Sequence, residues 1–195
     1  MGRLNNYRDR LIPKVKLENY SKKTLIELIK VYSRLYRSVD GFWFISVKEK
    51  VNNDTALDCD LWVWERQIKS ELKRIGETLD IKGDDVAAFF KIFQMCPWNL
   101  YLEYKMEIKG PNYGKMTIHK CPTLEALEKE GEGRDETFCK AVEPLMMDYH
   151  AKTFNPKMSA NYLKIPPRQA KNEICCIWEF ILEGTKRRGL AYRGR

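Results

Sequence analysis

The sequence lacks a long hydrophobic run. No segment approaches the roughly 18–20 consecutive apolar residues of a membrane span, and the first twenty residues alternate Arg, Asp, Lys and Glu where a secretory signal is apolar. We therefore expect a cytoplasmic protein without a membrane segment. Disulfide frameworks are rare in that compartment, so we expect the six cysteines to be thiols, redox groups or metal ligands.

The motifs of the common enzyme classes are also missing. The chain contains no Gly-x-Gly-x-x-Gly, no phosphate-binding loop, no Gly-x-Ser-x-Gly, no His-Glu-x-x-His and no Cys-x-x-Cys. Their absence excludes the enzyme classes that these motifs mark, and no short motif names a substrate.

Acidic residues are scarce at the two ends of the chain. Residues 1–23 hold seven Lys and Arg against two acids, and residues 184–195 hold five against none, so the net charge of +8 comes from the ends. A surface that binds phosphates usually lies on the folded body. We therefore expect solvated tails, including Lys186-Arg187-Arg188, and no nucleic-acid partner.

The composition is 44% apolar and 32% charged over 195 residues, which is typical of one compact soluble domain. We expect a single domain over 1–195, with basic terminal extensions at 1–20 and 184–195. Hydrophobic residues at helical spacing predict helices over 21–39, ended by Asp40-Gly41, and over 57–75, ended by Gly76. A third helix is predicted from Val86 to the Cys96-Pro97 pair.

The second half of the chain changes to a two-residue period. Alternation predicts a β-hairpin over about 99–120 and a central strand over about 174–182, with a short edge strand over 162–165. Two further helices are predicted over 123–130 and 135–150, the second kinked by Pro144. The predicted fold class is α+β, with an N-terminal helical layer packed on a small antiparallel sheet and two further helices.

The last predicted helix carries a chemically unusual face. Cys139, Glu143 and His150 recur there at helical spacing, which places a thiol, a carboxyl group and an imidazole together. These groups suit zinc or iron ligation, or a cysteine nucleophile with Glu or His as base. A core-facing stripe has the same spacing, and His150 could instead cap the helix or lie at the surface.

Other candidates surround this face. Cys121 precedes a helix start, where a thiolate would be stabilised. Cys175 and Cys176 should point to opposite faces of a strand, so at most one can join a one-sided site. Arg168 could clamp a ligand carboxylate or form an ordinary salt bridge. Trp178 belongs to an aromatic set that either lines a pocket for a flat ligand or packs the core.

These residues resemble a family of bacterial and archaeal cytosolic proteins, many of them named L-2-amino-thiazoline-4-carboxylic acid hydrolase-like. The likeness spans about residues 30–183 and rests on Asp40-Gly41-Phe42-Trp43, Cys121-Pro122, Cys139, Pro166-Pro167-Arg168 and Cys175-Cys176-Ile177-Trp178-Glu179-Phe180. The resemblance implies a small α+β protein that opens a sulfur heterocycle through a thiolate or a metal-bound water. Carried over by position, its cysteines are Cys121, Cys139 and Cys176. A weaker likeness, to small-molecule-binding domains of the vinyl-reductase type, implies a binding module.

Two functional hypotheses follow. The first is a hydrolase-like enzyme acting on a small anionic or sulfur-containing molecule. Its catalytic residues would be Cys139, Cys121, Glu143 and His150, and its substrate-binding residues Arg168 and Trp178. The second is a non-catalytic sensor that binds a small molecule or a metal, zinc or iron, through Cys121, Cys139 and Cys176. A homodimer is included among the expected partners.

Overall fold

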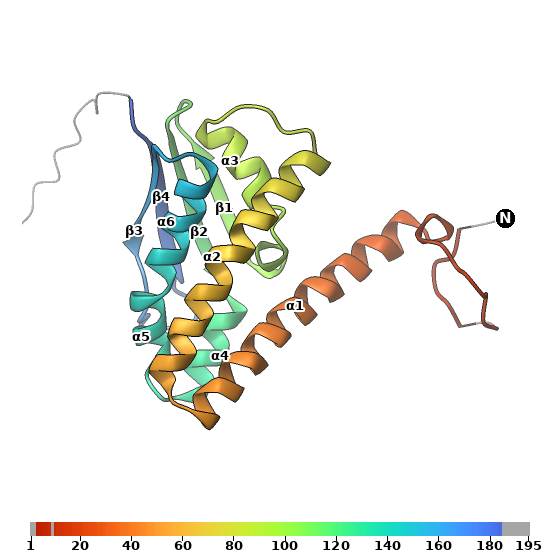
Figure 1. Cartoon of the computed structure of the whole chain (residues 1–195), viewed down its shortest axis with the longest axis horizontal. Coiled ribbons are helices and arrows are strands. Elements are labelled where there is room, and N and C mark those ends of the chain that lie inside the picture. Colours follow the sequence, from red (N-terminus) through yellow and green to blue (C-terminus); the bar gives the residue numbers. More distant parts are fainter. Residues whose placement is uncertain (1–2, 9, 185–195) are drawn as a thin grey trace, which may run out of the picture.

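The computed structural model describes residues 3–8 and 10–184 of the chain (Figure 1). The helices are α1 (Lys22–Lys50), α2 (Asn53–Thr78), α3 (Val86–Phe93), α4 (Pro122–Glu130), α5 (Arg134–Ala141) and α6 (Glu143–Phe154). The strands are β1 (Glu103–Ile108), β2 (Tyr113–Lys120), β3 (Met158–Lys164) and β4 (Cys176–Leu182). They form one antiparallel sheet in the order β1-β2-β4-β3. The predicted α+β class, with a helical layer on a small antiparallel sheet and β4 as a central strand, is confirmed.

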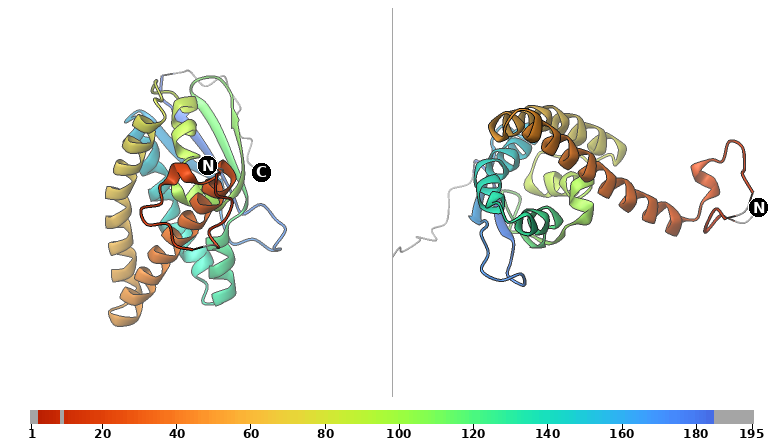
Figure 2. Two further views of the ribbon diagram at one scale, coloured as in Figure 1. Left: turned by 90° about the vertical axis from the view of Figure 1, so that its right-hand side faces the viewer. Right: turned by 90° about the horizontal axis from the view of Figure 1, so that it is seen from below.

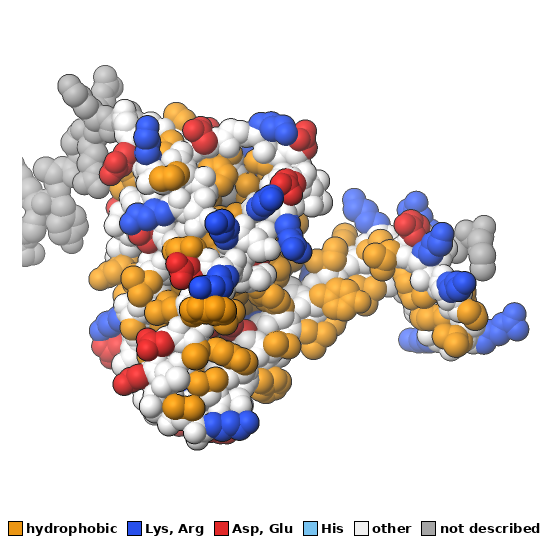
Figure 3. All heavy atoms as spheres, in the orientation of Figure 1, with side chains coloured by type: hydrophobic (Ala, Val, Ile, Leu, Met, Phe, Trp, Pro, Cys, Tyr) orange, Lys and Arg blue, Asp and Glu red, His pale blue; other side chains and the backbone are white. Residues whose placement is uncertain are grey.

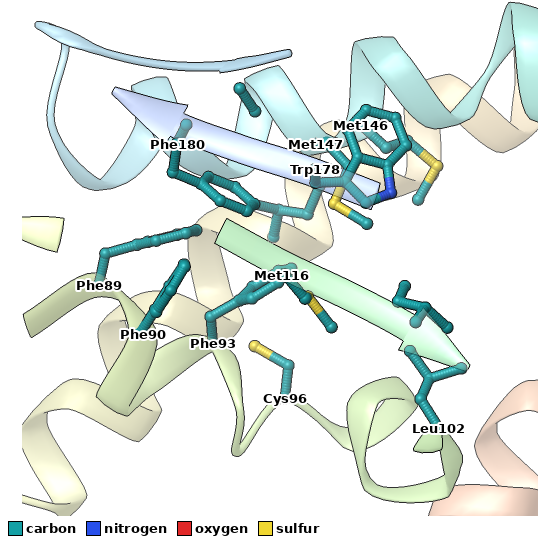
Figure 4. Packing of buried hydrophobic residues seen from close by; sticks show 14 of the residues in the cluster. Phe89, Phe90, Phe93, Cys96, Leu102, Met116, Met146, Met147, Trp178 and Phe180 are labelled. Carbon is teal, nitrogen blue, oxygen red and sulfur yellow. The ribbon is translucent and has the colours of Figure 1, made fainter. Parts of the chain in front are cut away.

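The core lies between one face of the sheet and the helices packed on it. Alternate residues of a strand share a face, and Met116 of β2 lies opposite Trp178 of β4 in the register. Both side chains are buried, as is Phe180. Phe89 of α3 contacts Phe180 with ring centroids 5.1 Å apart, and Figure 4 shows this aromatic cluster continuing along α3. The predicted helix from Val86 is confirmed, with the Asp85 side chain capping it.

Helix α1 is longer than the sequence predicts. Ser21 caps its start, but the helix passes through Asp40-Gly41 and ends at Lys50. A glycine inside a helix costs only about 1 kcal/mol relative to alanine. Beyond it, Phe44 is buried and contacts Phe138 edge-on at 6.3 Å. This tertiary packing stabilises the helix by more than Asp40-Gly41 destabilises it. Helix α2 likewise continues two residues past Gly76.

Pro144 separates two helices where the sequence predicts one kinked helix. Helix α5 ends at Ala141, and Pro144 lies in the first turn of α6. The missing N–H of proline has no cost in a first turn, because that donor has no partner within the helix. Cys139 therefore lies on a different helix from His150, and the predicted continuous face over 135–150 is wrong.

The strand boundaries also shift in ways that affect the cysteines. Pro97–Tyr101 forms a 3-10 helix, so β1 begins at Glu103 rather than at 99. The edge strand β3 begins at Met158, earlier than predicted. Strand β4 begins at Cys176, which leaves Cys175 just before the strand.

The first half of α1 and the segment before it project away from the body of the molecule (Figure 1). Figure 2, seen from below, shows the same projection at right angles to the first view. Leu4 pairs with Tyr20 in an isolated bridge at the end of this arm. Within the described residues, every helix is too short or too polar to cross a bilayer. The Lys186-Arg187-Arg188 stretch of the predicted basic tail lies outside the described residues.

Candidate functional site

Four of the six cysteines meet around one small cavity. Cys121 caps α4, Cys139 lies on α5, and Cys175 and Cys176 lie at the start of β4. All four line a cavity of about 30 Å³, room for about one water molecule. Its other lining residues are Trp98, Leu102, Ile118, Leu124, Glu143, Met147, Ile165, Pro166 and Trp178. We call this space the thiol cavity.

Both members of the cysteine pair reach the thiol cavity. The sequence-based expectation that at most one could join a one-sided site is wrong, because Cys175 precedes the strand and does not follow its alternation. The Cys175 thiol donates to the carbonyl oxygen of His119 at 3.4 Å. The Cys176 sulfur accepts the indole N–H of Trp178 at 3.2 Å. Trp178 thus orients a cysteine and completes the wall of the cavity.

The thiols of the cavity are held in the protonated form. Burial raises the pKa of Cys121 to about 12, although its sulfur accepts the Leu124 N–H at 3.4 Å. The pKa of Cys139 is also raised, first by burial and then by the neighbouring Glu143 carboxyl group. Burial raises the pKa of Cys176 well above the usual range. The helix start therefore does not stabilise a thiolate at Cys121, because desolvation is the larger effect.

A larger pocket lies between α1, α2, α4 and α5. Its volume is about 410 Å³, within the range of small-molecule sites. We call it the acidic pocket, since two aspartates belong to its wall. It is lined by Arg37, Ser38, Asp40, Gly41, Phe42, Phe44, Ile45, Asp60, Thr123, Ala126, Leu127, Glu130, Arg134 and Phe138.

Three carboxyl groups lie on the walls of the two spaces: Asp40 and Asp60 line the acidic pocket, and Glu143 lines the thiol cavity. Asp60 is 3% exposed, and its Oδ1 has no hydrogen-bond partner among the described residues. Burial, and after it the charges of Asp40 and Glu143, raise its pKa to about 7. Burial raises the pKa of Asp40 to about 6. Glu143, on the wall of the thiol cavity, has its pKa raised to about 7 by burial and by Asp40.

Sequence reasoning missed both aspartates of this group. Asp40 stands beside a glycine and was interpreted as a helix stop. Asp60 had a detectable signature, since Asp60, Trp64 and Ile68 follow one another at four-residue spacing, and all three are buried. An acidic residue on the apolar face of a predicted helix is the pattern that identifies it.

Two arginines also line the acidic pocket. One guanidinium nitrogen of Arg134 donates to both oxygens of Glu130, at 2.9 and 2.8 Å, and the guanidinium lies over the Phe44 ring at 4.6 Å. Arg37 lies over the Tyr101 ring at 5.2 Å, and its buried Nε has no hydrogen-bond partner among the residues described. The pocket therefore offers both cationic and anionic groups to a ligand.

His150 lies apart from both spaces. It is fully buried, contacts the Phe93 ring at 5.1 Å, and places Nδ1 2.8 Å from the Met146 carbonyl oxygen. Burial lowers its pKa to about 4. The interpretation as a capping or surface imidazole is wrong. No contact supports its predicted role as a proton carrier, because it lines neither the thiol cavity nor the acidic pocket.

Arg168 forms the ordinary salt bridge that the sequence left open. Its guanidinium binds both oxygens of Glu128, at 2.6 and 2.8 Å, and its side chain is 3% exposed. One nitrogen also lies 3.5 Å from the Cys175 sulfur. Arg168 lines neither space, so its position supports the loop beside the cavity rather than ligand binding.

The predicted metal ligands are not arranged as a metal site. In the described part of the chain, no group of three or more His, Cys, Asp or Glu side chains is arranged to hold a metal ion. The set Cys121, Cys139 and Cys176 shares one cavity but remains a prediction as a zinc or iron site. None of these cysteines forms a disulfide.

Comparison with known proteins places the chain in a family. A family profile described as a family of unknown function (DUF6125) matches residues 18–182. The chain belongs to this family. The match runs from before α1 to the end of β4, so it includes every residue of the acidic pocket and the thiol cavity. No curated protein and no solved structure matches the chain.

Proposed function

We propose that this DUF6125 chain is a hydrolase-like enzyme that binds a small zwitterionic molecule in the acidic pocket. The observation that supports it is the group formed by Asp40, Asp60 and Glu143 between a ligand-sized pocket and the thiol cavity. None of the three forms an ion pair with another described residue. Buried carboxyl groups without a cationic partner destabilise a fold, and they cluster where function requires them.

The pKa values of the three groups favour acid–base catalysis. A general acid or base works best when its pKa lies near the operating pH. Asp60 and Glu143, each with a pKa of about 7, are partly protonated and partly ionised at neutral pH. One carboxylate can therefore accept a proton from water while a neighbouring carboxyl group donates one.

The charges of the acidic pocket favour a ligand that carries both signs. Arg37 and Arg134 can bind a carboxylate group, while Asp40 and Asp60 can bind a basic nitrogen. Phe44 and Leu127 supply the apolar wall between them. A molecule that carries only one charge would leave one of these groups desolvated and unpaired.

The resemblance to the thiazoline hydrolase-like family indicates a candidate substrate with this charge pattern. L-2-amino-thiazoline-4-carboxylic acid has a carboxylate and a basic amidine-like end. In its hydrolysis, water adds to the ring carbon between sulfur and nitrogen, the carbon–sulfur bond breaks, and the sulfur takes a proton. The product is N-carbamoylcysteine. Protonated thiols favour carboxylate-activated water over attack by Cys121 or Cys139.

The test is to incubate the protein with L-2-amino-thiazoline-4-carboxylic acid and follow ring opening by proton NMR. We expect turnover at pH 7 that falls at least tenfold in Asp60→Asn. Asp58→Asn, an exposed change two residues away on α2, is the matched control and should retain full activity. No turnover by the wild type, together with no chemical-shift change of the compound, would refute both the activity and the ligand class.

The thiol cavity favours a second candidate, a sensor that binds a metal through its cysteines. The supporting observation is the convergence of four thiols from three chain segments, a donor type that zinc and iron prefer. The protein would be purified without oxygen or chelator and its metal content measured by mass spectrometry. Stoichiometric metal that is lost in Cys139→Ser but kept in Cys59→Ser would favour the sensor. Equal metal content in both variants would count against it.

A further inference from the structure

Helix α1 exposes a row of large apolar side chains along one of its sides. Tyr32, Leu35, Val39 and Phe42 are 60%, 55%, 69% and 73% exposed. In Figure 3 apolar side chains cover much of the projecting half of α1. A row of this kind is unusual on a monomer surface, where apolar residues are mostly scattered singly.

The row has the spacing of a coiled-coil seam. Its members are Leu25, Leu28, Tyr32, Leu35, Val39 and Phe42, at intervals of three, four, three, four and three residues. This alternation has the mean period of 3.5 residues that keeps one stripe facing a partner helix. We call these six residues the α1 seam.

The positions that flank the α1 seam carry no charge. In heptad terms the seam occupies a and d, and the flanking e and g positions are Thr24, Ile29, Val31, Tyr36, Ser38, Trp43 and Ile45. The charged residues between 24 and 47 are Glu27, Lys30, Arg34, Arg37 and Asp40, and all of them fall on b, c or f positions. A face without charges at its edges fits burial against another apolar helix.

Within the chain, Tyr32, Leu35, Val39 and Phe42 of the seam stay exposed, and Leu25 and Leu28 are half-buried. Other residues of α1 make its contacts with the body: Phe44 in the core, the Ser33 hydroxyl, which donates to the Pro97 carbonyl, and the Tyr36 hydroxyl, which donates to Glu71. The first half of the helix extends beyond the body (Figure 1, Figure 2). A helix of this kind gains most of its stability from packing of an apolar face, which this half lacks within its own chain.

We infer that the α1 seam binds the α1 helix of a second copy, in an antiparallel pair with two-fold symmetry. In one register, each of the six seam residues lies opposite a seam residue of the partner helix. Leu25 then lies opposite Phe42, Leu28 opposite Val39, and Tyr32 opposite Leu35, each pair occurring twice. Such a surface is complementary to itself, as a two-fold dimer requires.

The antiparallel direction also places the projecting half of each helix on its partner's body. A groove of about 260 Å³ lies between α1 and α2, and Tyr36, Val39, Trp43 and Val63 belong to its walls. It adjoins the C-terminal end of the seam. In the antiparallel pair, Leu25 and Leu28 of one copy approach the groove of the other.

The size of the surface agrees with what a stable dimer needs. The seam from Leu25 to Phe42 is about 25 Å long, at about 1.5 Å per residue. The exposed large apolar residues of the seam and its flanks, between 29 and 45, present on the order of 800 Å² of surface per copy, taking roughly 200 Å² for each whole side chain. A standard interface buries about 800 Å² per partner.

The oligomeric state of the full chain tests this inference. We expect light scattering after size exclusion at about 50 µM to give twice the mass of one chain for the wild type. Leu35→Glu, which places a charge in the centre of the seam, should give a monomer with unchanged far-ultraviolet circular dichroism. Arg34→Glu, an exposed neighbour at a c position, is the matched control and should remain dimeric.

Cross-linking tests the direction of the pair. Mixing Tyr32→Cys and Leu35→Cys proteins under mild oxidation should give a disulfide-linked dimer in the mixture, well above the level of either variant alone or of the wild type. A monomeric wild type, or a dimer that survives Leu35→Glu, would overturn the inference. So would a monomer that binds anionic lipid vesicles through the seam, because the occupant would then be a membrane surface.

Discussion

Replacing the buried Asp60 by asparagine should stabilise the protein at alkaline pH. The carboxyl group is 3% exposed, and burial raises its pKa to about 7. In the unfolded chain the same group ionises near pH 4. The folded state therefore binds a proton that the unfolded state has already released between these two values. Stability from this group is complete below about pH 4 and is lost as the pH rises towards 7.

The magnitude follows from the two pKa values. A change from 3.8 to about 7 corresponds to roughly 4 kcal/mol at pH 8, at about 1.4 kcal/mol for each pH unit. Part of this penalty reflects the charges of Asp40 and Glu143, which also raise the pKa. Asparagine has nearly the same shape and cannot ionise. We expect Asp60→Asn to raise the free energy of unfolding by about 3 kcal/mol at pH 8 and by about 0 at pH 4.

Urea unfolding followed by tryptophan fluorescence, at pH 4, 6 and 8, measures this difference. The slope of the transition should not change, because the surface exposed on unfolding is the same. Asp58→Asn should show no pH-dependent gain. An equal effect of Asp60→Asn at all three values, or destabilisation at pH 8, would refute the reasoning, because Asp60 would then be ionised and stabilised in the folded state.

Three further predictions concern one buried histidine and two glycines. The His150 imidazole, whose pKa is lowered to about 4 by burial, should titrate near pH 4 in an NMR series, so that stability from this group is lost as the pH falls from about 6.5 towards 4; a midpoint near 6.5 would contradict its burial. Gly114→Ala should lower the free energy of unfolding by about 1–3 kcal/mol, because its Cβ would lie 2.6 Å from Val86 and 2.7 Å from Phe90. Gly41→Ala, in a helix with no atom near the new methyl group, should raise that free energy by about 0.5–1 kcal/mol in the same urea assay. Changes of the same sign in both variants would show that close packing at Gly114 is not limiting.

Several parts of the fold could be predicted because local chemistry is sufficient for them. The predicted helix starts near 21 and at Val86 are capped by Ser21 and Asp85, and a side-chain oxygen beside free N–H groups needs no distant partner. The strand pairing of the hairpin and the central position of β4 follow from alternation and from a nearly continuous apolar run. Conversely, Asp40-Gly41 failed as a stop, because the burial of Phe44 against Phe138 is a long-range contact.

The sequence predicted most residues of the candidate site but not how they are arranged. Cys121, Cys139, Cys176, Glu143 and Trp178 do share one cavity. The reasoning that brought these residues together was wrong, because it assumed one continuous helix, which Pro144 divides into α5 and α6. Proline marks both a kink and a first turn, and only the packing of the two segments decides between them.

The sequence by itself determined which residue types were available: two histidines, four of the six cysteines in the second half, and basic ends. Local preferences and periodicity act over a few residues, so these features can be found without coordinates. Only the tertiary structure decided that Asp40, Asp60 and Glu143 interact, and that His150 and Arg168 stand apart from the pocket. Such groups come from helices distant in the chain, and their pKa values depend on burial and on neighbouring charges that the folded arrangement creates.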